Sequence, residues 1–189
     1  TCLVPAAPTS PTALPSRPDV FEAGRLISQP LIDFSGFTAD LGVLKTDAMS
    51  VDGFYRDVAG AGNVGYHVVL KTNDTFDLYK INSWAGLGNC GSSPSGTLSW
   101  SIGTQTLQGN YPFPANGIIF IEDHVVVDGQ INGARLTITA ADLPVPAPSG
   151  YKSIIINNDL SYTNYDGTDT IGLIGQDGVS VGMISENNL

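Results

Sequence analysis

Apolar and polar residues alternate along the last third of the chain, in a pattern that recurs. Residues 118–129, 153–164 and 172–183 each read as an alternating strand, a polar corner and a second alternating strand. When these copies are aligned, similar residues occupy equivalent positions, namely Ile119, Ile154 and Leu173; Asp123, Asn158 and Asp177; Val125, Leu160 and Val179; and Val127, Tyr162 and Val181. Because alternation buries one face, and a single bent ribbon cannot bury it alone, the copies should stack. The pattern therefore predicts a short parallel β-solenoid of about three rungs.

Glycine corners between the first two copies leave a second arrangement open. Residues 130–133 and 135–139 predict further short strands, and Asp128-Gly129 and Asn132-Gly133 predict corners that tolerate positive φ. Such dipeptides are also the strongest signal for a two-residue hairpin, so an antiparallel meander is the alternative. The copies recur as whole units, which favours the solenoid. The proline-rich stretch 143–148 should leave the stack as a loop, since proline cannot donate to a strand ladder.

The solenoid interpretation assigns shape-holding roles to two sets of residues. We expect glycines at the corners of the stack: Gly117, Gly129, Gly133 and Gly172. We expect apolar side chains inside it: Ile119, Val125, Ile154, Leu160, Leu173 and Val179. Both sets follow from the period-two alternation and from the freedom of glycine to adopt positive φ.

The chain upstream of the repeats divides into two parts. Residues 1–18 carry regularly spaced prolines and predict an extended, proline-rich linker. Residues 19–111 predict a small α/β region. In it, apolar residues at helical spacing after a possible N-cap, Thr38, predict a helix over about 37–49. Two alternating stretches predict a small antiparallel sheet, a hairpin over about 66–81, and the solenoid would then fill 112–189.

Composition narrows the class of protein and its partners. Charged residues make up 14% of the chain, against roughly 25% in an average soluble domain, and the 22 glycines and 12 prolines suit a turn-rich β protein. The formal net charge is −10, with the basic residues scattered, so direct nucleic-acid binding is disfavoured because it needs clustered cations. No apolar run approaches the roughly 18 residues of a membrane span.

The two cysteines, Cys2 and Cys90, lie far apart and have no metal-ligand spacing. We predict that they form one disulfide, which would indicate an oxidising compartment. Two buried free thiols are the alternative. The chain begins at Thr1 without an initiator methionine, so we expect a processed or truncated product.

The sequence offers no catalytic constellation. His67 in a hairpin strand and His124 at the first repeat corner have no partner at metal-ligand spacing, so both are expected to be structural, with His124 at an exposed corner. No GxSxG elbow, P-loop or GxGxxG motif follows a predicted strand. We therefore predict no enzyme and no cofactor.

Acidic and aromatic side chains are nevertheless candidates for a ligand surface. Asp123 and Asp177 could line up on one face of the solenoid, and Tyr162 and Tyr165 could stack against sugars. A carbohydrate-cleaving site would need two carboxylates roughly 5–9.5 Å apart in one groove. A ladder of polar corners, in which each side chain bonds nearby backbone amides, is the alternative.

A second polar turn suggests a weak candidate for calcium. Asp166 and Asp169 supply carboxylate oxygens within one short segment, but Ca²⁺ takes roughly six to eight oxygens and the EF-hand pattern is absent. A polar turn between two strands is the favoured interpretation.

Five stretches of the sequence carry a resemblance to a known family: residues 34–49 (FSGFTADLGVLKTDAM), 65–79 (GYHVVLKTNDTFDLY), 116–133 (NGIIFIEDHVVVDGQING), 153–160 (SIIINNDL) and 171–181 (IGLIGQDGVSV). Together they resemble a domain of bacterial pilus-assembly and surface proteins, similar to the β-solenoid portion of large type IV minor pilins of the Thermus–Deinococcus group. The resemblance implies a non-enzymatic, extracellular or cell-surface bacterial module for structure or adhesion, with other pilus or surface proteins as partners. The chain lacks the N-terminal hydrophobic helix of a complete minor pilin, so a fragment or a secreted relative is expected.

Two other classes of function remain open. The first is a carbohydrate-binding or carbohydrate-cleaving β-helix that uses Asp123, Asp177 and the neighbouring tyrosines. The second is a self-assembling filament subunit, because stacked rungs expose strand edges at both ends unless these are capped.

Overall fold

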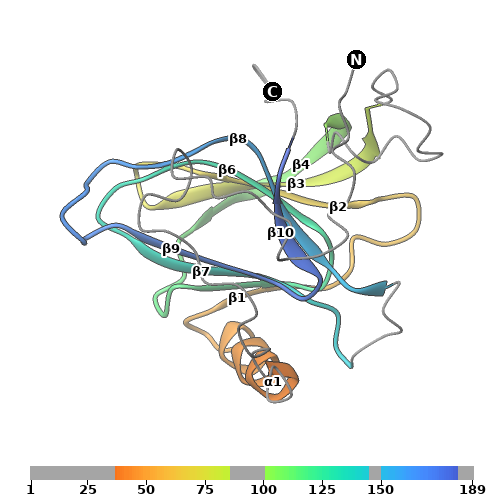
Figure 1. The fold of residues 1–189 in the computed structure, drawn as a ribbon, viewed down its shortest axis with the longest axis horizontal. Coiled ribbons are helices and arrows are strands. Elements are labelled where there is room, and N and C mark those ends of the chain that lie inside the picture. Colours follow the sequence, from red (N-terminus) through yellow and green to blue (C-terminus); the bar gives the residue numbers. More distant parts are fainter. Residues whose placement is uncertain (1–36, 86–100, 145–149, 183–189) are drawn as a thin grey trace, which may run out of the picture. The chain divides into compact units, whose positions relative to one another are not determined.

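The computed structural model describes residues 37–85, 101–144 and 150–182. These residues belong to the second of two units, Thr38–Leu189, apart from Phe37 at the start of the helix. The elements, in chain order, are α1 (Phe37–Ala48), β1 (Phe54–Arg56), β2 (Gly65–Leu70), β3 (Thr75–Trp84), β4 (Ile102–Pro112), β5 (Ile118–Ile121), β6 (Val125–Ile131), β7 (Arg135–Ala140), β8 (Ser153–Tyr162), β9 (Thr170–Gly175) and β10 (Gly178–Val181) (Figure 1). The prediction of a mainly β chain, with a helix near 37–49 and a hairpin near 66–81, is confirmed.

The strands form two sheets that face each other (Figure 1). Sheet A has the order β1-β5-β7-β9, and all its neighbours pair in parallel. Sheet B has the order β10-β8-β6-β2-β3-β4; its pairs from β10 to β2 are parallel, and β3 and β4 extend it in antiparallel fashion. The chain enters sheet A and then sheet B four times, in the strand pairs β1–β2, β5–β6, β7–β8 and β9–β10. An antiparallel meander of the repeat strands, the alternative arrangement, is therefore wrong.

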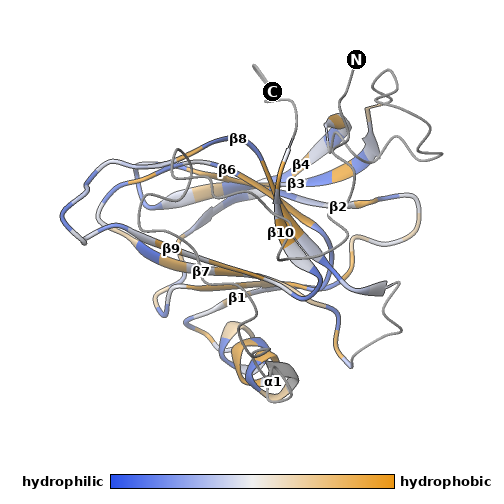
Figure 2. Ribbon diagram, in the orientation of Figure 1, coloured by the Kyte–Doolittle hydropathy of each residue, from blue (hydrophilic) through white to orange (hydrophobic). Residues whose placement is uncertain are grey.

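The core lies between the two sheets, where apolar side chains align in columns. In sheet A, Ile119 is in register with Ile138, and Ile138 with Leu173. In sheet B, Val125 is in register with Ile154. The four isoleucine and valine side chains are fully buried, and each contributes roughly 1.5–3 kcal/mol by leaving water. Apolar residues accordingly concentrate on the strands, and the loop that follows β8 is hydrophilic (Figure 2).

The predicted alignment of the middle repeat is wrong. Ile154, predicted to be equivalent to Ile119, instead lies opposite Val125 in sheet B. Leu160 is in register with Gly129, and its side chain is half-buried. The sheet A strand of this pair is β7, and the long corner that contains the proline-rich stretch separates it from β8. The extra length that contains the proline-rich stretch therefore lies between the two strands of one pair, β7 and β8, and not between two pairs.

Some of the predicted corner glycines lie within strands. Gly117 and Gly133 do lie at corners with φ of +74° and +69°, as predicted. Gly172 lies in the middle of β9, and Asp128-Gly129 lies in β6, where the register against β8 shifts. Gly129 keeps a positive φ of +103° because of this irregularity and not because of a chain reversal.

The helix α1 lies beside β1, near sheet A (Figure 1). Leu41 and Ala48 are buried on its inner side, and the Asn116 side chain donates a hydrogen bond of 3.0 Å to the Asp47 carbonyl. A second apolar cluster lies on the opposite face of sheet B from the core: Ile81, Ile102, Val126 and Ile155.

Strand pairing continues across the predicted domain boundary at residues 111 and 112. β1 pairs with β5 and β2 pairs with β6, so the α/β region and the repeats share both sheets. The proline-rich linker 1–18 lies outside the described residues. No helix in the described part of the chain is both long and apolar enough to cross a membrane.

Candidate binding site at the His124 corner

The corner between β5 and β6 carries three consecutive polar residues, Glu122, Asp123 and His124. Glu122 and Asp123 are 6% and 7% exposed, which is unusual for carboxylates. Each side chain is directed to a different neighbouring element, so this corner joins several parts of the fold. The alternation predicted a corner here, but it did not predict the burial.

Glu122 joins the helix to sheet A. Its carboxylate accepts hydrogen bonds from the Lys45 ammonium and the Tyr55 hydroxyl, and one of 3.3 Å from the Leu143 backbone N–H. Burial and then the Glu122 carboxylate raise the pKa of Tyr55 well above its ordinary value, so this phenol stays a donor. A buried carboxylate requires such partners, since its transfer from water is otherwise very costly.

Asp123 holds the chain between β1 and β2 against the second strand pair. Its carboxylate accepts 3.0 Å and 2.8 Å hydrogen bonds from the backbone N–H groups of Ala59 and His124, and lies 3.4 Å from the Lys152 ammonium. Lys152 immediately precedes β8, so one carboxylate contacts three successive strand pairs. Its oxygens are therefore used in structural hydrogen bonds.

His124 is half-buried, which differs from the exposed corner that the sequence predicted. Its Nδ1 accepts a 3.1 Å hydrogen bond from the Ser153 N–H, so the neutral ring carries its proton on Nε2. Burial, and then the nearby Lys152 ammonium, lower the pKa of His124 below its ordinary value. The imidazole is consequently neutral near pH 7.

The structure brings Asp123 and Asp177 to the same side of the stack. The Ser153 hydroxyl donates a 3.1 Å hydrogen bond to the Asp177 carboxylate, and the Asp177 N–H donates a 2.9 Å hydrogen bond to the Lys152 carbonyl. Ser153 is in register with Gly178, and Ile154 with Val125. Asp123, Lys152 and Asp177 therefore hold equivalent positions, and Lys152, not Asn158, lies between the two aspartates.

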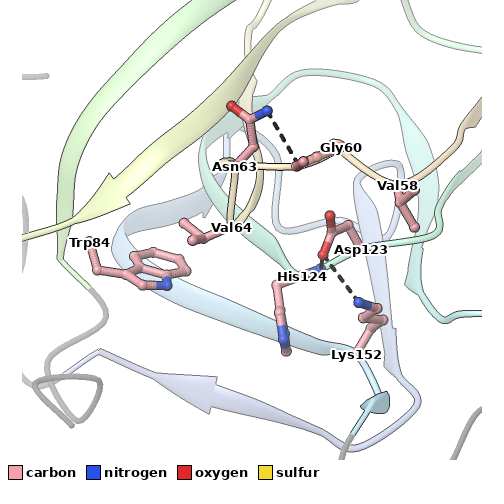
Figure 3. Close-up of a pocket in the computed structure, with 9 residues that line it drawn as sticks. Val58, Gly60, Asn63, Val64, Trp84, Asp123, His124 and Lys152 are labelled. Carbon is pink, nitrogen blue, oxygen red and sulfur yellow. Dashed lines mark hydrogen bonds and ion pairs between the residues drawn. The ribbon is translucent and has the colours of Figure 1, made fainter.

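A pocket of about 530 Å³ opens beside this corner. Figure 3 shows Trp84 on one side, Asp123 and Lys152 on the other, and the His124 ring between them. The lining is completed by residues from the β1–β2 connection, which are small or apolar except for one asparagine: Val58, Gly60, Ala61, Asn63 and Val64. The pocket thus offers an indole face for stacking and an ammonium group for hydrogen bonding. Neither Trp84 nor Lys152 was predicted as a site residue.

The two tyrosines lie elsewhere. Tyr162 ends β8, roughly 30 Å from Ser153 at its beginning, at the usual rise per residue. Its hydroxyl accepts a 3.1 Å hydrogen bond from the Ile171 N–H, and its ring centroid lies 6.1 Å from that of Tyr165, which is 84% exposed. The predicted ligand surface is therefore two separate regions at opposite ends of β8.

Asp166 and Asp169, the calcium candidates, are both engaged in the loop between β8 and β9. Asp169 is 4% exposed and accepts backbone hydrogen bonds from Gly133, Ala134 and Asn164. Burial opposes ionisation, but these N–H groups outweigh it and hold the pKa of Asp169 below its ordinary value. Asp166 accepts hydrogen bonds of 3.0 Å and 2.6 Å from the N–H and hydroxyl of Thr168. Within residues 37–85, 101–144 and 150–182, no group of three or more His, Cys, Asp or Glu side chains could hold a metal ion.

His67 is buried away from the pocket. Its Nε2 lies 3.1 Å from an Asp128 carboxylate oxygen, its Nδ1 lies 2.9 Å from Gln105 Oε1, and its ring stacks on Tyr79 at 5.7 Å between centroids. The geometry suits the structural role predicted for this histidine. Asp128, predicted to form a turn, is its buried partner at 5% exposure.

The predicted disulfide between Cys2 and Cys90 falls on residues outside the described ranges. In comparisons with protein-family models, curated proteins and solved structures, nothing matches this chain. The fold and the site therefore define it as a mainly β protein with parallel and mixed sheets and a polar corner pocket.

Proposed function

We propose that this chain is a non-enzymatic structural or adhesion module of a bacterial pilus or cell-surface assembly, built as a short β-solenoid. In this interpretation each strand pair is one rung, and successive rungs bury one another's apolar faces. The observation that carries the proposal is the in-register column in each sheet, Ile119–Ile138–Leu173 and Val125–Ile154. Strand pairs joined in this way by continuous ladders suit a scaffold.

The surface chemistry supports an extracellular scaffold. Charged residues are only 14% of the chain, and the loop after β8 is stabilised by hydrogen bonds to Asp166 and Asp169 rather than by ion pairs. The resemblance of residues 116–133 and 153–160 to minor-pilin domains supports the same role. Partners would then be other pilus or surface proteins.

Fractionation of the source cells tests this role. Antibodies against the chain should detect it in the sheared surface or envelope fraction, and it should co-purify with pilus or envelope proteins after cross-linking of intact cells. A variant with Ile154→Asp, which should be strongly destabilised, controls for nonspecific capture. Recovery in the cytoplasmic fraction alone would overturn the proposal.

Carbohydrate binding is a second candidate function, and the corner pocket favours it. A volume of about 530 Å³ lies within the range of small-ligand sites. The indole of Trp84 lines one side of the pocket, where a sugar ring would stack, and Lys152 provides an ammonium donor at the other side. Aromatic stacking combined with a few polar groups is the usual chemistry of such sites.

A glycan array, with and without Ca²⁺, tests the second candidate. Binding at the pocket should be lost in Trp84→Ala and retained in Tyr165→Ala, which removes an exposed ring at the other end of β8. If Tyr165→Ala alone abolished glycan binding, the binding site would lie at Tyr162 and Tyr165 and not in the pocket. No binding in the parent would remove the candidate, and thermal melts would confirm that both variants fold.

A further inference from the structure

The two ends of the stacked strand pairs differ in how the apolar core is covered. The β1–β2 end is covered by aromatic side chains. There sheet A stops at the short strand β1, and sheet B continues into β3 and β4. The Phe54 ring packs against Phe76 and Tyr111 at centroid distances of 4.9 Å and 5.1 Å. The Arg56 guanidinium lies over the rings of Phe54 and Tyr111, at 4.5 Å and 4.9 Å. Aromatic side chains and a cation therefore close the apolar core at this end.

At the β9–β10 end, apolar side chains of the described residues reach the surface. β9 and β10 are the outermost strands of sheets A and B, and nothing within the described residues pairs with their free edges. Along sheet B, Val125 and Ile154 are fully buried, but Val179, the next residue in the column, is 46% exposed. In the neighbouring column Val127 is fully buried and Val181 is 76% exposed. The prediction that Val179 lies inside is therefore wrong, because no strand among the described residues pairs with the outer edge of β10.

The free edges also lack most of the usual protection, although β10 is short, with 4 residues. Soluble proteins guard edge strands with lysine, proline, bulges or very short strands. Residues 170–182 contain no Lys, Arg or Pro, and Asp177 is their sole charged residue. By contrast, β4 ends at Pro112 and shifts register against β3 at three points, and β1 has 3 residues including Arg56. The β9–β10 end is thus the unguarded one.

We propose that the β9–β10 end binds the same end of a second copy of this chain, edge to edge about a twofold axis. A strand edge is self-complementary when it pairs in antiparallel fashion, so both copies can use one surface. The exposed Val179 and Val181 of each copy would then be covered. Like copies with a net charge of −10 repel one another, and this end, with one carboxylate among residues 170–182, minimises the repulsion.

The covered β1–β2 end favours a closed dimer over a filament. Head-to-tail growth would need the β9–β10 edges to meet free edges at the β1–β2 end. There the aromatic cluster covers the core, and β3 and β4 already pair beyond β2. The pairing is therefore closed at two copies, in contrast to the filament alternative. This inference rests on the stacking of the strands and not on the proposed surface role, so either can fail alone.

Sedimentation equilibrium of the full chain tests the pairing. We expect a monomer–dimer equilibrium that strengthens in high salt, where the repulsion between copies is screened. Val181→Lys should weaken the dimer at least tenfold. Val51→Lys is the matched control, since Val51 is 97% exposed in the turn after α1 and its replacement adds the same charge. Thermal melts should show that both variants stay folded.

Three results would overturn the proposal. The first is a strict monomer at the highest attainable concentration in high salt. The second is a dimer that Val181→Lys and Val51→Lys weaken equally, or not at all, because the interface would then lie elsewhere. The third is a series of assemblies that grow beyond the dimer with concentration, which would restore the filament.

Discussion

Two glycines, one in β6 and one at the corner after it, allow a matched test of close packing between strands. Gly129 in β6 has a φ of +103°, and Gly133 at the following corner has a φ of +69°. Replacement by alanine strains the backbone at both positions, at a cost of roughly 1–2 kcal/mol each. The two positions differ in their surroundings. A Cβ added to Gly133 meets nothing within 4 Å, whereas one added to Gly129 would lie 2.2 Å from the Leu70 carbonyl oxygen.

The obstacle at Gly129 is backbone, and it cannot swing aside as a side chain can. Leu70 lies in β2, which is hydrogen-bonded to β3 on one side and to β6 on the other. Forcing extra volume into such a site costs about 1–3 kcal/mol in addition to the φ strain. We therefore expect Gly133→Ala to lower the free energy of unfolding by about 1–2 kcal/mol, and Gly129→Ala by about 2–5 kcal/mol.

Urea and thermal unfolding, followed by circular dichroism, measure both variants against the parent. For a chain of this size each kcal/mol lowers Tm by roughly 2–4 °C, so Gly129→Ala should melt clearly below Gly133→Ala. Alanine reduces the conformational freedom of the unfolded chain equally at both positions, and this effect cancels in the comparison. If the two variants melted together, or in the reverse order, the close approach of β6 to β2 would be refuted.

Three further predictions concern the core and two titrating side chains. Ile154→Asp should destabilise the fold by roughly 3–5 kcal/mol because it buries an unpaired charge, and a melt that superimposes on the parent would contradict this. The pKa of Asp169 is lowered in the folded state, so its contribution to stability should be present above about pH 4 and be lost as the pH falls further; urea midpoints of Asp169→Asn should depend less on pH in that range. The pKa of His124 is also lowered, so stability should fall as the pH drops below about 6.5, and a His124→Asn variant that kept the same slope would exclude this residue as its cause.

The sequence predicted the strands best where both members of a strand pair are contiguous. Residues 118–129 contain β5 and most of β6, and residues 172–183 contain most of β9 and all of β10; each pair is joined by a short polar corner. The alignment failed at 153–164, because a strand alternates in the same way whichever sheet it joins. The proline-rich corner separates β8 from its partner β7 in the sequence. The ten residues of β8 therefore resemble a complete repeat of two strands and a corner.

The candidate site was predictable only in part. Asp123 and Asp177 belong to the correctly aligned copies, and they do lie on the same side of the stack. The pairing of Lys45 with Glu122 joins residues 77 positions apart and depends on where α1 packs. The sequence predicts a turn at Asp128, because Asp-Gly commonly forms one. In the fold it instead stays in β6, where its carboxylate meets a buried histidine.

Asp123, Lys152 and Asp177 also favour one register of the stacked strands. Replacing a largely buried ion pair with apolar residues is often neutral or even stabilising, so stability alone does not explain why the buried Asp123 is paired with the half-buried Lys152 at this corner. Their equivalent positions with Asp177 give a column of charges that alternates in sign along the stack. A slip of one residue in β8 would reverse the faces of all its side chains and remove Lys152 from between the two carboxylates. We therefore infer that this column sets the register of the third strand pair. The pocket beside it shares Lys152 and Asp123, so a ligand bound there would contact the residues that align the strands.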